Sequence, residues 1–291
     1  MRICKECGTE IFIEEANFCW ICGAELEGEE ILMKDGDEVY EKGVVEEDDG
    51  DCLFEFEISA NGEKILTKFA DRNAKHVEIP SDVTSIKASV FEDYHNIESI
   101  ILPLGLRSIG NRCFRNCTSL KKINLPISLC SIGNEVFAKC TALTEIRLPN
   151  GLKTMGDGVF SECKSLKSVN IPRSITVIKR KTFEWCTSLK VAPLHEGIKT
   201  IDYDGFAHCT SLQKVVLPRS VKSLGIGAFF YCSGIRDIYI GTELTELGFY
   251  SLLECKKAVL HYEGGWFEWL RVKGHLKEGK RVNRVVFRSK P

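Results

Sequence analysis

The amino-acid sequence predicts a solenoid of stacked repeats preceded by a small metal-binding module. Two observations predict it: phenylalanine recurs every 23 residues from Phe91 to Phe229, and two Cys-x2-Cys-Gly turns stand near the N-terminus. The composition, with 44% hydrophobic and 27% charged residues, is that of a globular protein. We expect five segments in order: a metal-binding module (1–26), an acidic linker (27–51), a β-hairpin cap (52–76), the solenoid (77–255), and a C-terminal cap with a basic tail (256–291).

The first segment carries its four cysteines in two C-x2-C-G turns, at Cys4 and Cys7 and at Cys19 and Cys22. Two such turns supply four sulfur ligands and leave no open position, which is typical of structural and not of catalytic zinc. The segment resembles a minimal zinc ribbon over about residues 3–26, and Zn²⁺ is the cofactor that we expect. Two disulfides are the alternative, which the absence of a hydrophobic signal segment in MRICKECG disfavours.

The second segment is strongly acidic. Residues 25–51 hold 13 acidic and two basic side chains, whereas residues 52–291 carry a net charge of +11. Runs of like charge are usually solvated, so we interpret this segment as a linker. The alternative is that it folds back onto the basic solenoid and competes with an acidic partner. The hairpin cap follows: apolar and polar residues alternate on both sides of Asn61-Gly62, and this hairpin should cover the edge of the first repeat.

Each repeat has the pattern F-x-x-C-x-x-L-x-x-I-x-L-P-x-S-L-x-x-I-G. The L-x-x-I-x-L stretch is the strand-forming part of a leucine-rich repeat, and proline ends the strand. The predicted fold is therefore a leucine-rich repeat solenoid with a β-strand plus a short helical or irregular segment in each repeat. The sequence resembles BspA-like leucine-rich repeat proteins over about residues 77–251. This resemblance implies a binding protein of the cell surface or a secreted one, although this sequence carries no recognisable export signal.

The resemblance extends to the C-terminal cap, where Tyr262–Trp269 is similar to the closing segment of that family. We expect Trp266 and Trp269 to pack within this cap and not to stack on a ligand. The last residues, 271–290, hold eight basic residues and one acidic residue.

A second set of cysteines keeps the phase of the repeat. Because equivalent side chains of a parallel stack point the same way, we interpret these thiols as small buried hydrophobes, and not as disulfide, metal or redox sites. Cys130 differs, because its equivalents are Arg107, Lys153, Lys199 and Lys222, so an exposed thiol is expected there. The in-phase set is Cys117, Cys140, Cys163, Cys186, Cys209, Cys232 and Cys255.

Variable positions of the repeat are the candidates for partner binding. Trp185, His208 and Tyr231 precede successive in-phase cysteines, with Phe230 beside them, and Tyr239 faces outward from a strand. Exposed aromatics in a row are typical of binding hot spots, and packing between adjacent repeats is the alternative explanation. Basic residues gather at Arg173, Lys179, Arg180 and Lys181, where they favour an acidic partner or serve solubility alone.

No phosphate loop, G-x-S-x-G elbow or H-E-x-x-H motif is present in the sequence, and no small-molecule substrate is evident. We therefore expect a non-enzymatic scaffold for protein–protein interaction. The alternative is a nucleic-acid-associated protein that binds through the ribbon and the basic solenoid face. No stretch approaches the roughly 18 apolar residues of a membrane helix, and the expected location is cytoplasmic.

Overall fold

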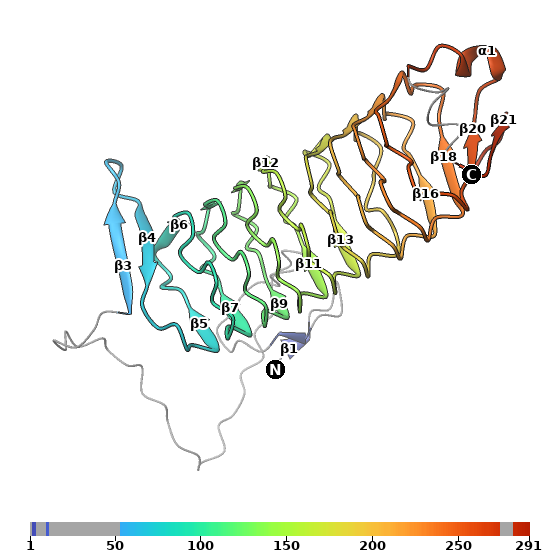
Figure 1. Ribbon diagram of the computed structural model, residues 1–291. Helices are drawn as coiled ribbons and strands as arrows, with labels where there is room; N and C mark the ends of the chain where they lie inside the picture. Colours follow the sequence, from blue (N-terminus) through green and yellow to red (C-terminus); the bar gives the residue numbers. More distant parts are fainter. Residues whose placement is uncertain (1, 4–9, 12–52, 274–281) are drawn as a thin grey trace. The chain divides into compact units, whose positions relative to one another are not determined.

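The computed structural model describes residues 53–273 and 282–291, together with two short strands near the N-terminus (Figure 1). The chain divides into two units, Met1–Asp51 and Cys52–Pro291. In the first unit, β1 (Arg2–Ile3) and β2 (Glu10–Ile11) pair in antiparallel fashion. The four cysteines expected to bind zinc and the whole acidic linker lie outside the described residues.

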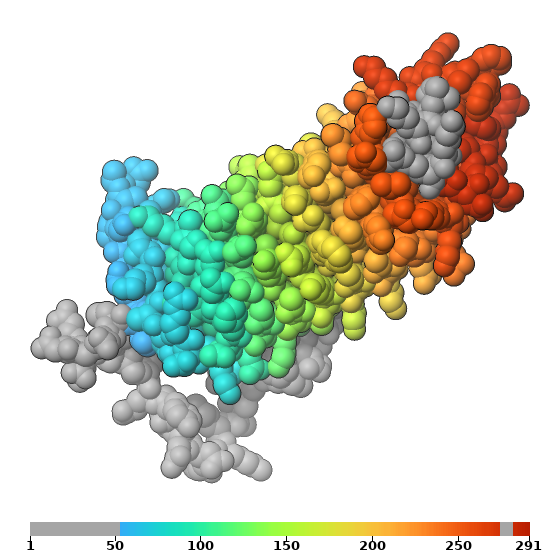
Figure 2. Space-filling view, viewed as in Figure 1, coloured from blue at the N-terminus to red at the C-terminus, as the bar shows by residue number. Residues whose placement is uncertain are grey.

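The second unit is a β-solenoid of coils stacked in sequence order, which Figure 2 shows as successive colour bands. The first strand of a coil comes from the L-x-x-I-x-L stretch, and equivalent strands pair in parallel, as Ile146 does with Val169. One coil has only an isolated bridge here, between Val191 and Lys214. We call this surface face A. Its strands are β5 (His76–Glu78), β7 (Ser99–Ile101), β9 (Lys122–Ile123), β11 (Glu145–Arg147), β13 (Ser168–Asn170), β16 (Lys214–Val216), β18 (Asp237–Ile240) and β20 (Val259–Tyr262).

Each coil also has a second short strand, which the sequence pattern did not predict. It comes from the Ser-Ile pair before the repeat glycine, and equivalent pairs form a second parallel surface, face B, in which Ser131 lies opposite Ser108. The strands of face B are β6 (Val83–Ile86), β8 (Ser108–Ile109), β10 (Ser131–Ile132), β12 (Thr154–Met155), β14 (Val177–Ile178), β15 (Thr200–Ile201), β17 (Ser223–Leu224) and β19 (Glu246–Leu247).

The glycine that follows face B permits close approach of neighbouring coils. A Cβ atom placed on Gly156 would lie 2.4 Å from the carbonyl carbon of Gly133, and one on Gly248 would lie 2.4 Å from that of Gly225. Real side chains do not tolerate such distances to a neighbouring backbone. Glycine therefore permits this close approach in these coils, whereas Lys179 and Asp202 occupy the same position in two other coils.

The segment between face B and the next face A strand is a run of turns, so the expectation of a short helical segment is wrong and the irregular alternative holds. Two residues in each such segment adopt left-handed backbone angles, for example Lys181 (φ 54°) and Trp185 (φ 60°). Positive φ interrupts helical hydrogen bonding. The N–H groups donate instead to the next coil, as Phe160 does to the Thr182 carbonyl at 3.0 Å. Within residues 53–273 and 282–291 the single helix is α1 (Trp266–Trp269).

The repeat phenylalanines form a continuous stack through the core. From Phe91 to Phe229 the rings are fully buried, successive centroids lie 5.0 to 5.8 Å apart, and the rings are tilted by only 3 to 16°. Offset stacking of this kind adds about 0.5–1.5 kcal/mol per pair to the free energy of burial. The stack is therefore the continuous core that the 23-residue period predicted.

The in-phase cysteines are buried free thiols, as expected, but they also donate hydrogen bonds. Each Sγ lies 3.0 to 3.2 Å from the carbonyl oxygen of the phenylalanine 26 residues earlier, in the preceding coil. Tyr94 occupies this position in the first coil, and its hydroxyl donates to the Phe69 carbonyl. Cys130 is half-buried, so it is the most accessible of the described thiols but not the fully exposed one that the sequence predicted.

Both ends of the solenoid are closed. At the N-terminal end β3 (Phe54–Ile58) and β4 (Lys64–Phe69) form the expected antiparallel hairpin, and β4 pairs in parallel with β6. At the C-terminal end β21 (Arg284–Phe287) pairs with β20. Trp269 is buried against Tyr262, as predicted, with ring centroids 5.1 Å apart. Trp266 contacts Phe287 with ring centroids 5.5 Å apart, but about half of its surface remains exposed.

Candidate interaction surface

The third side of the solenoid, which we call the turn face, is formed by the turn segments that follow face B. It comprises residues 87–94, 110–117, 133–140, 156–163, 179–186, 202–209, 225–232 and 248–255. Equivalent side chains of successive coils form columns along it. Because the core positions of these segments are fixed, the chemistry of the surface is set by the columns that vary.

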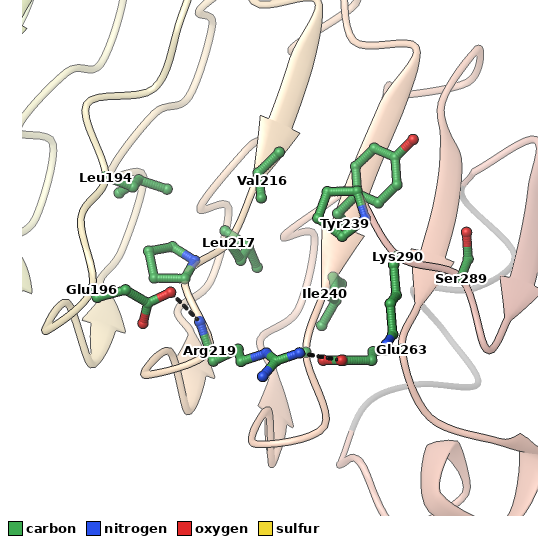
Figure 3. Close-up of a pocket in the computed structure, with 13 residues that line it drawn as sticks. Leu194, Glu196, Val216, Leu217, Arg219, Tyr239, Ile240, Glu263, Ser289 and Lys290 are labelled. Carbon is green, nitrogen blue, oxygen red and sulfur yellow. Dashed lines mark hydrogen bonds and ion pairs between the residues drawn. The ribbon is translucent and has the colours of Figure 1, made fainter.

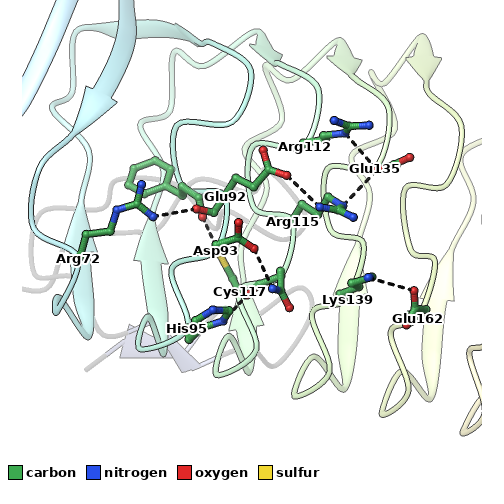
Figure 4. A network of polar contacts seen from close by, with 12 residues as sticks. Arg72, Glu92, Asp93, His95, Arg112, Arg115, Cys117, Glu135, Lys139 and Glu162 are labelled. Atoms are coloured by element: carbon green, nitrogen blue, oxygen red, sulfur yellow. Dashed lines mark hydrogen bonds and ion pairs between the residues drawn. The ribbon is translucent and has the colours of Figure 1, made fainter.

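The N-terminal half of the turn face is polar (Figure 4). Arg115 forms ion pairs with Glu92 at 3.0 Å and with Glu135 at 3.2 Å, and Arg112 also reaches Glu135 at 3.2 Å. Lys139 lies 3.6 Å from Glu162. Exposed pairs of this kind contribute little to stability. In these pairs the basic side chains neutralise the acidic ones, so this half of the turn face is a solvated polar surface.

In the C-terminal half, the column immediately before the in-phase cysteines becomes aromatic. The rings of Trp185 and His208 are stacked with centroids 3.8 Å apart, and His208 and Tyr231 follow at 5.3 Å. Phe230 meets the edge of His208, also at 5.3 Å. The structure thus brings together four of the predicted partner-binding residues. They pack on one another, yet Trp185 is 40% exposed and Tyr231 is 46% exposed.

The backbone gives no reason for aromatic residues in this column. Trp185, His208 and Tyr231 have φ angles of 60°, 61° and 59°, in the left-handed region that favours glycine, asparagine and aspartate. The same column holds Asp93, Asn116, Lys139 and Glu162 in the N-terminal half. Aromatic side chains at these positions are therefore tolerated against backbone preference, which favours a role for their exposed surface.

Two charged neighbours face the imidazole of His208. Partial burial lowers the pKa of His208, and the carboxylates of Glu184 and Asp204 oppose that shift. The pKa of Asp204 is raised, first by burial and then by Glu184. Burial between the neighbouring rings thus favours the uncharged form of the His208 imidazole.

A second apolar column lies on the same half of the turn face, and sequence reasoning missed it. Its members follow the repeat glycine position, where the N-terminal half has Asn111, Asn134 and Asp157. The two asparagines accept hydrogen bonds from the following coil, so they are part of the frame. Comparison of the sequence column by column would have revealed the change. The exposed members in the C-terminal half are Tyr203, Ile226 and Phe249, with Tyr250 beside Phe249.

The predicted basic cluster is not one surface. Arg173 precedes β14, whereas Lys179 follows it. The guanidinium of Arg180 lies over the Tyr203 ring at 5.4 Å, and the ammonium of Lys181 pairs with Glu184 at 3.2 Å. Two of the four basic groups are therefore engaged by neighbours on the turn face.

Tyr239 lies on face A, apart from the other predicted aromatics. Its ring is stacked on His261 with centroids 4.3 Å apart, and the ammonium of Lys214 lies 4.7 Å from its centre. A cavity of about 560 Å³ opens beside it (Figure 3). The rim of this cavity carries the ion pair between Arg219 and Glu263, at 2.6 Å.

His261 also joins Asp237 and Ser289 in one hydrogen-bonded row. Its Nε2 lies 2.8 Å from Asp237 Oδ1 and its Nδ1 lies 2.9 Å from Ser289 Oγ. In hydrolases the serine hydroxyl faces Nε2 and the carboxylate is buried. Here the nitrogens are exchanged and Asp237 is partly exposed, so solvent weakens its field. We interpret the row as a link between β18, β20 and the C-terminal residues.

Among the described residues, no group of three or more His, Cys, Asp or Glu side chains is placed to hold a metal ion. Within the same residues, no helix is long and apolar enough to cross a membrane.

The model of the BspA type leucine-rich repeat region matches residues 66–190 and 178–261, in six copies. The chain belongs to the BspA-type leucine-rich repeat family. The family match spans the aromatic columns of the turn face and ends before α1 and β21. No curated protein matches the sequence.

Solved structures of leucine-rich repeat proteins share this fold. The T. pallidum leucine-rich repeat protein is 29% identical, with a TM-score of 0.58, over 63% of this chain and 88% of that one. A leucine-rich repeat protein from Bacteroides ovatus is 24% identical, with a TM-score of 0.52, over 73% of this chain and 70% of that one. Both likenesses concern the solenoid fold.

Proposed function

We propose that this BspA-type chain is a non-enzymatic scaffold that binds a protein partner through the C-terminal half of its turn face. One observation carries the proposal: two columns that are mostly polar in the first coils hold aromatic or aliphatic side chains in later coils. The exposed ones are Trp185, Tyr203, Ile226, Tyr231 and Phe249. Tryptophan and tyrosine are enriched in the centres of protein interfaces, where they bury a large area at little entropic cost. The polar half of the same face has no such feature.

The nucleic-acid alternative has less support. At the predicted basic cluster, phosphate binding would need several unpaired cations on one face. Arg173 and Lys179 lie on opposite sides of β14, and Lys181 is already paired with Glu184. Stacking of bases on aromatic rings would need exposed ring faces. The faces of Trp185 and His208 are turned toward each other.

Affinity capture of the full chain from its native cells, with and without nuclease, tests this proposal. We expect a set of partner proteins that survives nuclease and is lost when Trp185→Ser and Tyr231→Ser are combined. The control combines Ile101→Ser and Leu104→Ser, which remove exposed apolar side chains on and after a face A strand. Loss of all partners on nuclease treatment, or equal capture by both double variants, would refute it.

We also propose that Cys4, Cys7, Cys19 and Cys22 bind one structural Zn²⁺. The support is the spacing of the two C-x2-C-G turns, and a module of this size needs a metal to fold. Thiolate ligands must be reduced, so the proposal includes an intracellular location, which cell fractionation tests. Elemental analysis of the purified chain should find one zinc ion, absent from Cys4→Ser/Cys22→Ser and retained in Cys130→Ser. A zinc-free wild-type chain would refute it.

A further inference from the structure

The C-terminal cap presents an apolar patch that no other part of the described chain covers. Trp269 of α1 points inward and is buried, whereas Trp266 and Phe267 point outward and are 52% and 80% exposed. Leu270, directly after the helix, is also exposed. Figure 1 shows α1 at the C-terminal end of the solenoid. We call Trp266, Phe267 and Leu270 the cap patch.

The cap patch is held in place by hydrogen bonds. The N–H of Gly265 donates to the Glu268 carboxylate at 2.5 Å, and the N–H of Trp269 donates to the Gly265 carbonyl at 3.1 Å. The N–H of Arg288 donates to the Gly264 carbonyl at 3.0 Å, which fixes the start of α1 to the end of β21. The exposed rings therefore project from a fixed backbone, whose entropy of ordering is already lost before binding.

Basic residues outnumber acidic residues in the C-terminal cap that carries the cap patch. Residues 256–291 contain ten lysines and arginines but three acidic residues. Of these acids, Glu263 is paired with Arg219 at 2.6 Å and Glu268 accepts the Gly265 N–H. The exposed basic side chains of the described cap are Lys256, Lys257, Arg271, Lys273, Arg284, Arg288 and Lys290.

We propose that the cap patch binds the surface of an anionic phospholipid bilayer. Tryptophan and phenylalanine prefer the interface between water and acyl chains, and lysine and arginine attract anionic headgroups. A protein partner is less well matched, because a stable protein interface buries about 800 Å² on each side, far more than three side chains offer. Insertion of a few apolar side chains beside basic residues is sufficient for reversible membrane binding.

Vesicle co-sedimentation of the full chain tests this proposal. We expect binding to vesicles of phosphatidylcholine with phosphatidylglycerol, little binding to phosphatidylcholine alone, and weakening by added salt. Trp266→Ser combined with Phe267→Ser should reduce the partition coefficient about tenfold or more. Arg271→Glu combined with Lys273→Glu should abolish the preference for the anionic lipid. The matched control, Phe249→Ser with Tyr250→Ser, removes two exposed aromatics of the turn face and should bind as the wild type does.

Circular dichroism establishes that each variant is folded. If the serine double variant does not fold, Phe267→Asp alone serves instead, because that side chain is the most exposed of the patch. Absence of wild-type binding to anionic vesicles would overturn the proposal. Equal binding by the wild type and the folded cap-patch variant would overturn it as well. Neither result tests the protein-binding role proposed for the turn face, which the affinity-capture experiment tests separately.

Discussion

The indole ring of Trp185 lies parallel to the imidazole ring of His208, with an interplanar angle of 3° and centroids 3.8 Å apart. The two residues stand 23 positions apart in the sequence, in equivalent left-handed turns of neighbouring coils. The same register that stacks the phenylalanines in the core therefore stacks variable residues on the surface. A substitution in one coil therefore affects the equivalent residues of the neighbouring coils. The four predictions that follow use this 23-residue register.

The pH dependence of stability should include a contribution from His208. Burial lowers its pKa below the ordinary value of 6.5, so the unfolded chain binds a proton more readily than the folded chain does. This contribution to stability is complete above pH 6.5 and is lost as pH falls from 6.5 through the lower pKa of His208 in the folded chain. We expect the free energy of unfolding of His208→Gln to change less between neutral and mildly acidic pH than that of the wild type. Urea titrations measure this, with His195→Gln as the control; equal pH dependence in all three proteins would contradict it.

The phenylalanine stack should be most sensitive at its centre. Phe160 is fully buried between Phe137 and Phe183, so Phe160→Ala leaves a cavity in a core that extends on both sides. We expect a loss of about 3–5 kcal/mol in the free energy of unfolding. Chemical denaturation measures the loss, and Ile127→Ala, which truncates an exposed side chain, should cost far less. A cost at Phe160 no greater than at Ile127 would mean that the stack is not the core.

Thiol reactivity should differ sharply between two described cysteines. Burial raises the pKa of Cys163 to about 12, and its Sγ–H donates to the Phe137 carbonyl at 3.0 Å. Cys130 is only half-buried. Because thiolate is the reactive species, a maleimide at neutral pH should modify Cys130 first. Peptide mass spectrometry of the folded chain measures this, and modification of Cys163 at the same rate would contradict the structure.

The repeat glycine should be essential where coils are in closest contact. Gly156→Ala would place a Cβ 2.4 Å from the Gly133 carbonyl carbon, so the coils must separate. We expect a cost of about 1–3 kcal/mol in the free energy of unfolding. Gly105→Ala is the matched control, because no atom lies within 4 Å of its added Cβ. Equal stability of the two variants would show that the coils separate without cost.

The sequence predicted the 23-residue period and the buried cysteines because both follow from side-chain chemistry repeated in one phase. It did not predict face B, because a two-residue strand gives no alternating pattern and exists only through pairing between coils. The thiol hydrogen bonds escaped prediction for the same reason, since donor and acceptor lie in different coils.

The candidate surface was predicted in part. Trp185, His208 and Tyr231 were found because they share one phase with the cysteines, whereas Tyr203, Ile226 and Phe249 follow a glycine position that Lys179 and Asp202 interrupt. The exposure of Trp266 was missed because its resemblance to a closing segment predicted packing and gave no information on which side of α1 is buried.

Site-specific photo-crosslinking in the native cell tests the central claim most directly. A photoreactive phenylalanine derivative replaces Tyr231 in one protein and Asn116, the equivalent residue of the polar half, in another. If the C-terminal half of the turn face binds the partner, position 231 should crosslink to a defined protein and position 116 should not. Crosslinks of equal yield from both positions, or from position 116 alone, would contradict that claim.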